Sequence, residues 1–159
     1  MLYFDLFEIP VAIKFDRTIL SKKYFELQKK FHPDFYTLAT EVEQQEVLEK
    51  SSQVNKALKV LKNEDATLEY ILTEKGILLP DEKFQLPPDF LMEVMELNED
   101  FDATTPEKIK AFEEAIFEDV EPIINNYNNE LITPTDLQQL KTYHFKKKYL
   151  QRILERIED

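Results

Sequence analysis

The sequence predicts an all-α fold, and three observations support this prediction. Only one of the 159 residues is glycine, whereas an average protein contains about 7% glycine, and turn-rich β folds need glycine where φ is positive. Hydrophobic residues make up 43% of the chain, which is enough to build a core. These residues recur at spacings of three and four, which is the period of an amphipathic helix.

The first half of the chain predicts a short opening helix, an antiparallel helical hairpin and a closing helix. The expected ranges are 1–8, 17–31, 42–61 and 65–75. The apolar face of the second helix consists of Leu20, Tyr24, Leu27 and Phe31. Pro33 ends this helix because proline disfavours helical geometry in the preceding residue. Residues 35–41 are expected to form a loop, and Gly76 to end the fourth helix.

The second half of the chain predicts a three-helix bundle. Residues 77–89 contain three prolines and no helical period, so they mark a domain boundary. Three helices with short connections follow over 88–101, 106–130 and 134–158, with Thr105 and Thr133 as candidate N-caps. We therefore expect an N-terminal domain over residues 1–76, a packed linker over 77–87 and a C-terminal domain over 88–159.

Composition excludes several classes of protein. The net charge of −12 argues against a nucleic-acid binder, and residues 81–130 alone hold 15 acidic and 3 basic side chains. The absence of cysteine excludes disulfides and thiolate metal sites. No apolar run approaches the roughly 20 residues that span a membrane, and the first residues lack the pattern of a secretory signal. We expect a cytoplasmic protein.

A basic helix ends in the tripeptide His32-Pro33-Asp34. Residues 17–31 contain five basic residues and only one acidic residue, Glu26. The basic residues, which are expected on the solvated side of the helix, are Arg17, Lys22, Lys23, Lys29 and Lys30. Pro33 restricts His32, so Asp34 stands on a stiff turn. A rigid polar tip beside a positive face suits an acidic groove on a partner protein, since little entropy is lost on docking. The alternative is an ordinary solubilising charged face.

An enzyme that uses His32 and Asp34 is a further alternative. Such a pair needs a nucleophile or a metal ion held in a pocket. The only other histidine is His144, and neither histidine has the spacing of a metal ligand. We therefore predict no catalytic residue, no metal site and no cofactor.

The segment DFLMEVMELNEDF, residues 89–101, predicts a helix with two apolar stripes. The core stripe consists of Phe90, Val94, Leu97 and Phe101. The second stripe consists of Leu91, Met92 and Met95, bordered by Glu96 and Glu99. A three-helix bundle rarely buries more than half of a helix's circumference, so the second stripe predicts a protein-binding face. The alternative is that both stripes are buried.

The segment HFKKKYLQRIL, residues 144–154, predicts a basic helix with one tyrosine at the edge of its core face. Tyr149 lies about 90° from the centre of the apolar stripe on a helix of 3.6 residues per turn. The stripe itself consists of Leu150, Ile153, Leu154 and Ile157. Tyr149 is therefore expected to be half-buried, either as a plain boundary residue or as part of a binding surface.

The HPD tripeptide between two antiparallel helices, the first of them basic, resembles the signature of the J-domain. The resemblance covers about residues 1–75. J-domain proteins stimulate ATP hydrolysis by DnaK-type chaperones, so the resemblance implies that His32, Pro33 and Asp34 form the stimulating tripeptide. It also implies that the cationic contact consists of Lys22, Lys23, Lys29 and Lys30. One residue departs from the pattern, because Phe35 stands where lysine is common.

The opening YFDLFEIP, the segment PPDFLMEVMELNE and the closing helices are similar to the HscB family, the J-type co-chaperones of iron–sulfur cluster assembly. In that family the J-domain engages the chaperone HscA, or DnaK where HscA is lacking, and the C-terminal bundle binds the scaffold protein IscU. The scaffold-binding residues that this resemblance implies are Leu91, Met92, Met95, Glu96, Glu99 and Tyr149. It also implies that the chain is not an enzyme, because the chaperone hydrolyses the ATP. A J-domain adaptor for another client remains an alternative.

Overall fold

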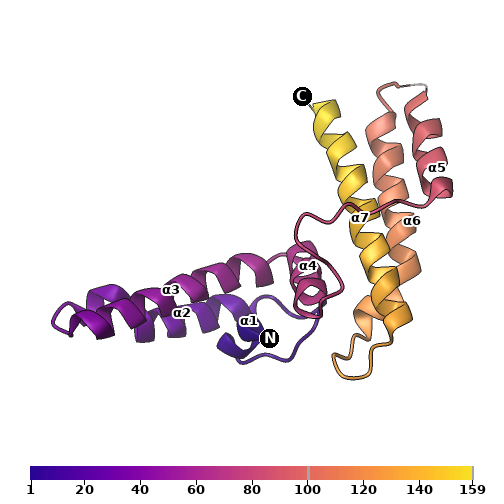
Figure 1. The fold of residues 1–159 in the computed structure, drawn as a ribbon. Helices are drawn as coiled ribbons and strands as arrows, with labels where there is room; N and C mark the ends of the chain where they lie inside the picture. Colours follow the sequence, from indigo (N-terminus) through magenta and orange to yellow (C-terminus); the bar gives the residue numbers. More distant parts are fainter. Residues whose placement is uncertain (100, 159) are drawn as a thin grey trace. The chain divides into compact units, whose positions relative to one another are not determined.

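The computed structural model describes residues 1–99 and 101–158, and every regular element within them is helical (Figure 1). This confirms the predicted all-α class. The chain divides into two compact units, Met1–Glu74 and Lys75–Asp159. None of the helices within the described residues is both long and apolar enough to cross a membrane.

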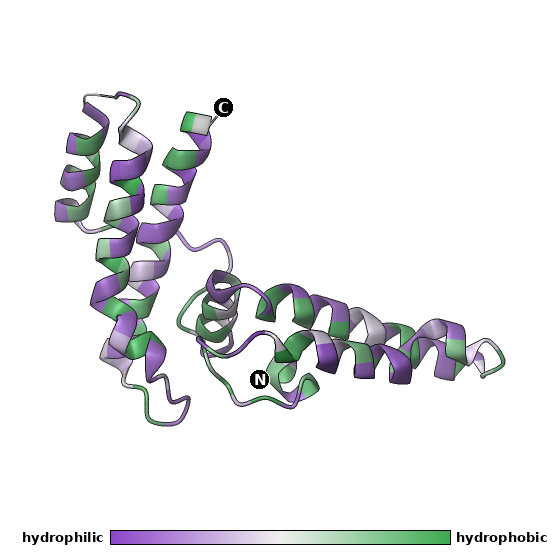
Figure 2. Cartoon of the chain, turned by 180° about the vertical axis from the view of Figure 1, so that it is seen from behind, coloured by the Kyte–Doolittle hydropathy of each residue, from purple (hydrophilic) through white to green (hydrophobic). Residues whose placement is uncertain are grey.

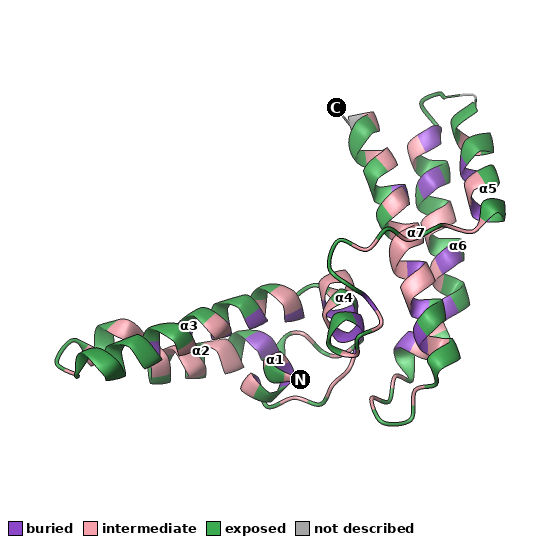
Figure 3. Ribbon diagram, viewed as in Figure 1, coloured by how far each residue is buried: buried purple, intermediate pink, exposed green. Residues whose placement is uncertain are grey.

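The first unit is a helical hairpin closed at one end by two shorter helices. Its elements are α1 (Leu2–Leu6), α2 (Ile19–Phe31), the 3₁₀ helix η1 (Pro33–Tyr36), α3 (Glu41–Leu61) and α4 (Glu64–Glu74). Helices α2 and α3 lie side by side and are joined through η1 (Figure 1). The fully buried side chains gather at the closed end, among them Phe4, Phe7, Ile13, Val54, Leu61, Ile71 and Leu72. The other end of the hairpin is mostly exposed (Figure 3).

Two details of the first unit differ from the sequence prediction. Residues 35–41 were expected to be loop, but η1 covers Pro33–Tyr36, because Pro33 supplies the fixed φ of a first turn. Arg17 was expected on the solvated face of the basic helix, but it precedes α2. Its guanidinium donates to the carbonyls of Leu61 and Ile13, each at 2.8 Å. Arg17 therefore has a structural role.

The second unit is a three-helix bundle. Its helices α5 (Pro88–Glu99), α6 (Thr105–Asn125) and α7 (Pro134–Glu158) lie side by side (Figures 1 and 2). Hydrophobic and hydrophilic positions alternate around each helix in Figure 2, as an amphipathic period requires. The buried core is formed by Phe90, Val94, Ile109, Ile116, Val120, Ile124, Leu140, Tyr143 and Leu150.

The helix ends of the second unit confirm some predictions and correct others. Thr133 caps α7, since its hydroxyl accepts the Asp136 N–H at 3.1 Å. Thr105 is not a cap but the buried first residue of α6. Helix α6 ends at Asn125, five residues before the expected end, because the Asn128 side chain accepts the following N–H groups and stabilises a turn. Phe101 lies beyond the end of α5 and is exposed, so it does not belong to the core stripe.

The segment before α5 is packed on α7. Gly76 adopts a φ of +72°, a left-handed conformation in which glycine has no steric cost. Farther along, the Phe84 ring stacks on Phe145 with 4.6 Å between centroids. The Glu82 carboxylate accepts a hydrogen bond from the Lys141 ammonium at 2.7 Å. These two contacts attach residues 82–86 to the bundle.

Candidate protein-binding sites

The HPD tripeptide forms an exposed and internally braced tip at the end of α2. His32 is extended, with φ −69° and ψ 129°, as the following proline requires. Its Nδ1 accepts the Asp34 N–H at 3.2 Å and lies 3.5 Å from an Asp34 carboxylate oxygen. The Asp34 side chain is nevertheless 85% exposed. The tip thus presents a carboxylate to solvent from a fixed backbone.

Residues after the tripeptide hold the tip to both helices of the hairpin. The Tyr36 hydroxyl donates to the Lys30 carbonyl at 2.6 Å, and the Gln44 amide donates to the carbonyls of Tyr36 and Thr37. The Thr40 hydroxyl caps α3 by accepting the Glu43 N–H. The connection is therefore a braced turn, although it lies at the exposed end of the hairpin.

The four lysines of α2 differ in their surroundings. Lys23 lies 3.6 Å from the Glu8 carboxylate. Lys29 stands over the Phe25 ring at 4.7 Å and Lys30 over the Phe31 ring at 5.2 Å. Within residues 1–99 and 101–158, no ion pair involves Lys22, Lys29 or Lys30. These three cations remain free to meet an acidic partner.

Sequence reasoning missed several exposed apolar residues of the hairpin, among them Phe25, Leu38 and Val42. Phe25 lies on α2 outside the apolar stripe, and Leu38 follows η1 and is 99% exposed. Phe35 is also exposed and packs its edge against the His32 ring at 6.1 Å. The available signal was that Phe25 is a large aromatic among the lysines of α2, off the stripe of Leu20 and Leu27.

The N-terminal end of α5 is fixed by aromatic contacts. Phe90 is buried and stacks on Phe112 with 5.4 Å between centroids, and Tyr149 places its edge against Phe90 at 6.1 Å. The Lys146 ammonium lies 5.4 Å from the same Phe90 ring. One face of α5 is therefore anchored in the bundle, and this anchoring fixes the direction of the opposite face.

The opposite face of α5 carries the predicted methionine stripe. Met92 is 61% exposed and Met95 is 70% exposed, whereas Leu91 is half-buried. A shallow hollow of about 520 Å³ is lined by Met92, Met95, Glu96, Asn98 and Glu99. We call these five residues and Leu91 the methionine patch. It is an apolar surface with an acidic border, and its thioethers can adapt to a partner's shape.

Tyr149 does not line the hollow of the methionine patch. It is half-buried on α7 and lines a different pocket, formed by α7 and residues 82–86. Its connection to α5 runs through the ring contact with Phe90. The structure therefore brings Met92, Met95, Glu96 and Glu99 together. Tyr149 is not among them and contacts α5 on its anchored face, through Phe90.

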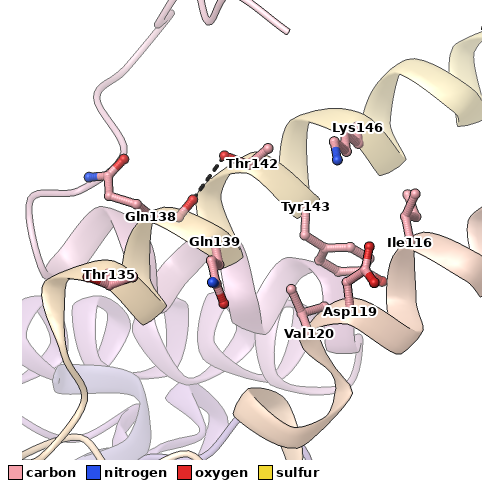
Figure 4. A pocket seen from close by; sticks show the side chains of 9 residues that line it. All are labelled: Ile116, Asp119, Val120, Thr135, Gln138, Gln139, Thr142, Tyr143 and Lys146. Atoms are coloured by element: carbon pink, nitrogen blue, oxygen red, sulfur yellow. Dashed lines mark hydrogen bonds between the residues drawn. The ribbon is translucent and has the colours of Figure 1, made fainter. Parts of the chain in front are cut away.

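A further pocket of about 550 Å³ lies between α6 and α7 (Figure 4). Its lining combines apolar side chains, Ile116 and Val120, with hydroxyl and amide side chains and with two charged groups, Asp119 and Lys146. Thr142 donates its hydroxyl hydrogen to the Gln138 carbonyl at 3.0 Å. The lining contains no histidine beside Asp119. It therefore offers no histidine–aspartate pair of the kind that the enzyme alternative requires. In the described part of the chain, no group of three or more potential ligands is placed to hold a metal ion.

Comparisons with known sequences identify the family. A family model described as the HscB C-terminal oligomerisation domain matches residues 86–158. The co-chaperone protein HscB homolog of Photobacterium profundum is 34% identical over 136 residues, which are 82% of this chain and 76% of that protein. The homolog of Vibrio parahaemolyticus is 41% identical over 103 residues, which are 64% of this chain and 60% of that protein. The chain thus spans less than two thirds of the latter relative.

Solved structures agree with the sequence comparisons. The chaperone HscB from Vibrio cholerae matches with a TM-score of 0.64 at 26% identity, and the match covers 98% of this chain and 98% of that chain. Human co-chaperone protein HscB has a TM-score of 0.78 at 25% identity, with 98% of this chain and 80% of that chain covered. The two helical units share the fold of these proteins, whose own names describe chaperones or co-chaperones. This chain belongs to the HscB family.

Proposed function

We propose that this chain stimulates the ATPase of a DnaK- or HscA-type chaperone and delivers to it an IscU-type iron–sulfur scaffold protein. The observation that carries the proposal is the exposure of two different surfaces on two separate units. One is the HPD tip beside a cationic helix, and the other is the methionine patch. The proposal includes the cytoplasmic location expected from the sequence.

The chaperone half of the proposal depends on the geometry of the tip. Asp34 and the free ammonium groups of α2 offer opposite charges on one rigid unit. Such a unit can bias the conformational equilibrium of a chaperone only if it binds one state more tightly than the other. The bracing of η1 lowers the entropy lost on binding, so more of the contact energy is available for this bias.

Single-turnover ATP hydrolysis by a cognate chaperone tests this half with the His32→Gln variant. We expect stimulation to fall by about tenfold or more, as for a residue at the centre of an interface. The thermal midpoint should stay unchanged, because His32 is not a core residue. The matched control is Thr37→Ala, an exposed change in the same turn. Undiminished stimulation by His32→Gln refutes the role of the tripeptide.

The client half of the proposal depends on the methionine patch. Its apolar atoms are exposed on a helix that Phe90 anchors, so they can dock without rearrangement of the bundle. Burial of such a surface on a partner releases about 25 cal/mol per Å² of apolar area before the costs of association. The residues that we assign to scaffold binding are Leu91, Met92, Met95, Glu96, Glu99 and Tyr149.

A binding titration with a purified IscU-type scaffold tests this half. The triple variant Leu91→Ala, Met92→Ala, Met95→Ala should bind about tenfold more weakly or worse. The control Leu79→Ala, Leu131→Ala removes exposed apolar side chains outside the patch and should bind as the unchanged protein does. Scaffold binding that survives the triple change contradicts the assignment. Capture of a different protein through the same residues would indicate an adaptor for another client.

A further inference from the structure

A second pocket of the C-terminal unit has the chemistry of an anion-binding site. Its volume is about 420 Å³, and it lies between α7 and residues 82–86. Its walls are aromatic, from Phe84, Phe145 and Tyr149, and its cations are Lys83, Lys148 and Arg152. We call it the basic pocket. The cations of the basic pocket belong neither to the HPD tip nor to the methionine patch.

The cations of the basic pocket have no acidic partner in the described part of the chain. All three are exposed, and none takes part in an ion pair within residues 1–99 and 101–158. The single carboxylate in the lining, Glu82, is instead held by Lys141 at 2.7 Å. Lys148 and Arg152 belong to the basic segment 144–154, whereas Lys83 comes from residues 81–130, which hold 15 acidic and 3 basic side chains.

The walls of the basic pocket are fixed before any ligand arrives. The stacked rings of Phe84 and Phe145 are nearly parallel, with an interplanar angle of 4°. The Lys141 ammonium lies 5.7 Å from the Phe84 ring and ties the same segment to α7. Tyr149 is held by its edge contact with Phe90. Ordering the aromatic walls would therefore add little to the entropy cost of ligand binding.

The spacing of the cations fits an extended peptide. Lys148 and Arg152 stand one helical turn apart, about 6 Å along the axis. Side chains at alternate positions of an extended segment are separated by about 6.6 Å and point the same way. Two carboxylates at such positions match the two cations, and Lys83 faces them from residues 82–86. Arginine adds a paired hydrogen bond to one carboxylate.

We propose that the basic pocket binds an extended acidic segment of a protein partner, with carboxylates at alternate positions contacting Lys148 and Arg152. The methylene groups of these acidic side chains pack against the aromatic walls. The chemistry of the segment follows from this pocket alone. Only the identity of the protein that carries the segment rests on the proposed function, since Tyr149 belongs both to the pocket and to the assigned scaffold-binding residues.

Fluorescence anisotropy with a labelled peptide of alternating glutamate and alanine tests the proposal on the full chain. We expect binding at low salt that weakens as salt rises, and none to the matching glutamine peptide. The variant Lys148→Glu, Arg152→Glu should bind about tenfold more weakly or worse. The control Lys108→Glu, Lys110→Glu has the same charge change on exposed positions of α6 and should stay within about twofold. Circular dichroism verifies that both variants fold.

Amide NMR shifts during the same titration locate the peptide. Shifts at Lys83, Lys148, Tyr149 and Arg152 are expected. Shifts confined to the lysines of α2, equal affinity of the two charge variants, or salt-dependent self-association in place of peptide binding would each overturn the proposal. Neither chaperone nor scaffold is present in this experiment, so its failure is distinct from a failure of the proposed function.

Discussion

Arg17 joins three parts of the first unit through one guanidinium. It donates to the carbonyls of Leu61 and Ile13, lies near the Thr67 hydroxyl, and stacks over Phe15 at 4.2 Å. Its partial burial lowers its pKa, but arginine stays charged at any pH at which proteins fold. The side chain therefore closes the turn before α2 onto the end of α3.

The variant Arg17→Ala should destabilise the protein by about 2 kcal/mol, because it leaves carbonyls at the closed end of the hairpin without a charged donor. Urea unfolding measures the change. Lys22→Ala, an exposed change on the same segment, should cost less than about 0.5 kcal/mol. Equal effects of the two changes would show that Arg17 is only one more surface cation.

Phe35 stands where J-domain proteins commonly have lysine, and its side chain is exposed beside His32. The Phe35→Lys variant adds a positive charge next to the free lysines of α2. We expect faster association with a chaperone at low salt and a steeper loss of affinity as salt rises. Stopped-flow association at several ionic strengths measures both. An unchanged salt dependence would place Phe35 outside the contact.

At the scale of residues, the sequence predicted the backbone conformation of a residue better than it predicted which groups its side chain contacts. The geometry of His32 follows from Pro33, a local restriction that sequence reveals directly. The role of Arg17 depends on carbonyls up to 44 positions away in the chain, and its position next to four lysines favoured the wrong interpretation. The exposure of Phe25, in contrast, could have been predicted from its position outside the apolar stripe of α2.

At the scale of elements, helix starts depend on single side chains. Thr133 caps α7, the longest helix, through its hydroxyl oxygen. Thr133→Ala should cost about 1 kcal/mol, whereas Thr133→Ser keeps the oxygen and should cost less. Thermal unfolding compares the two. Equal losses would mean that packing of the threonine methyl group, and not the cap, is responsible.

The Glu82–Lys141 ion pair makes the attachment of residues 82–86 to α7 dependent on pH. The hydrogen bond from Lys141 holds the pKa of Glu82 below its ordinary value of 4.5. A depressed pKa in the folded state stabilises the protein above the ordinary value, and this contribution is lost as pH falls through the folded pKa. The pair should therefore stabilise the second unit at neutral pH and not in strong acid.

The Glu82→Gln variant tests this pH dependence. Its thermal midpoint should lie below that of the unchanged protein at about pH 7, and the two midpoints should converge once the pH falls below the lowered pKa of Glu82. Lys83→Gln, a change at the neighbouring exposed residue, serves as the control and should show no such convergence. A difference in thermal midpoint that persists in acid would mean that Glu82 stabilises the segment without its charge.

Helix existence was predictable from the apolar period, and helix ends were less so. Helices α3 and α4 begin and end within about one residue of the expected ranges, because caps and Gly76 mark them. Helix α6 stops early because a local turn at Asn128 competes with the helix, although the sequence has no proline or glycine there. The early end of α5 removed Phe101 from the core stripe.

At the scale of the whole molecule, the two surfaces belong to separate compact units of one chain. If one chain must hold client and chaperone together, its benefit is the high effective concentration of a linked pair. A mixture of the His32→Gln variant and the Leu91→Ala, Met92→Ala, Met95→Ala variant should then fail to restore scaffold-dependent ATPase stimulation. Steady-state ATP hydrolysis measures this. Full restoration by the mixture would mean that the two functions need no covalent connection.

The exposure of Met92 and Met95 has a chemical consequence for the cell. Thioethers that stand in water are open to peroxide, and each sulfoxide replaces an apolar sulfur with a polar, chiral group. Oxidative stress would thus make the methionine patch, which we assign to client binding, more polar, while His32 and Asp34 stay chemically intact. Methionine sulfoxide reductases reverse this lesion, so reductive repair would restore client loading without new synthesis of the protein.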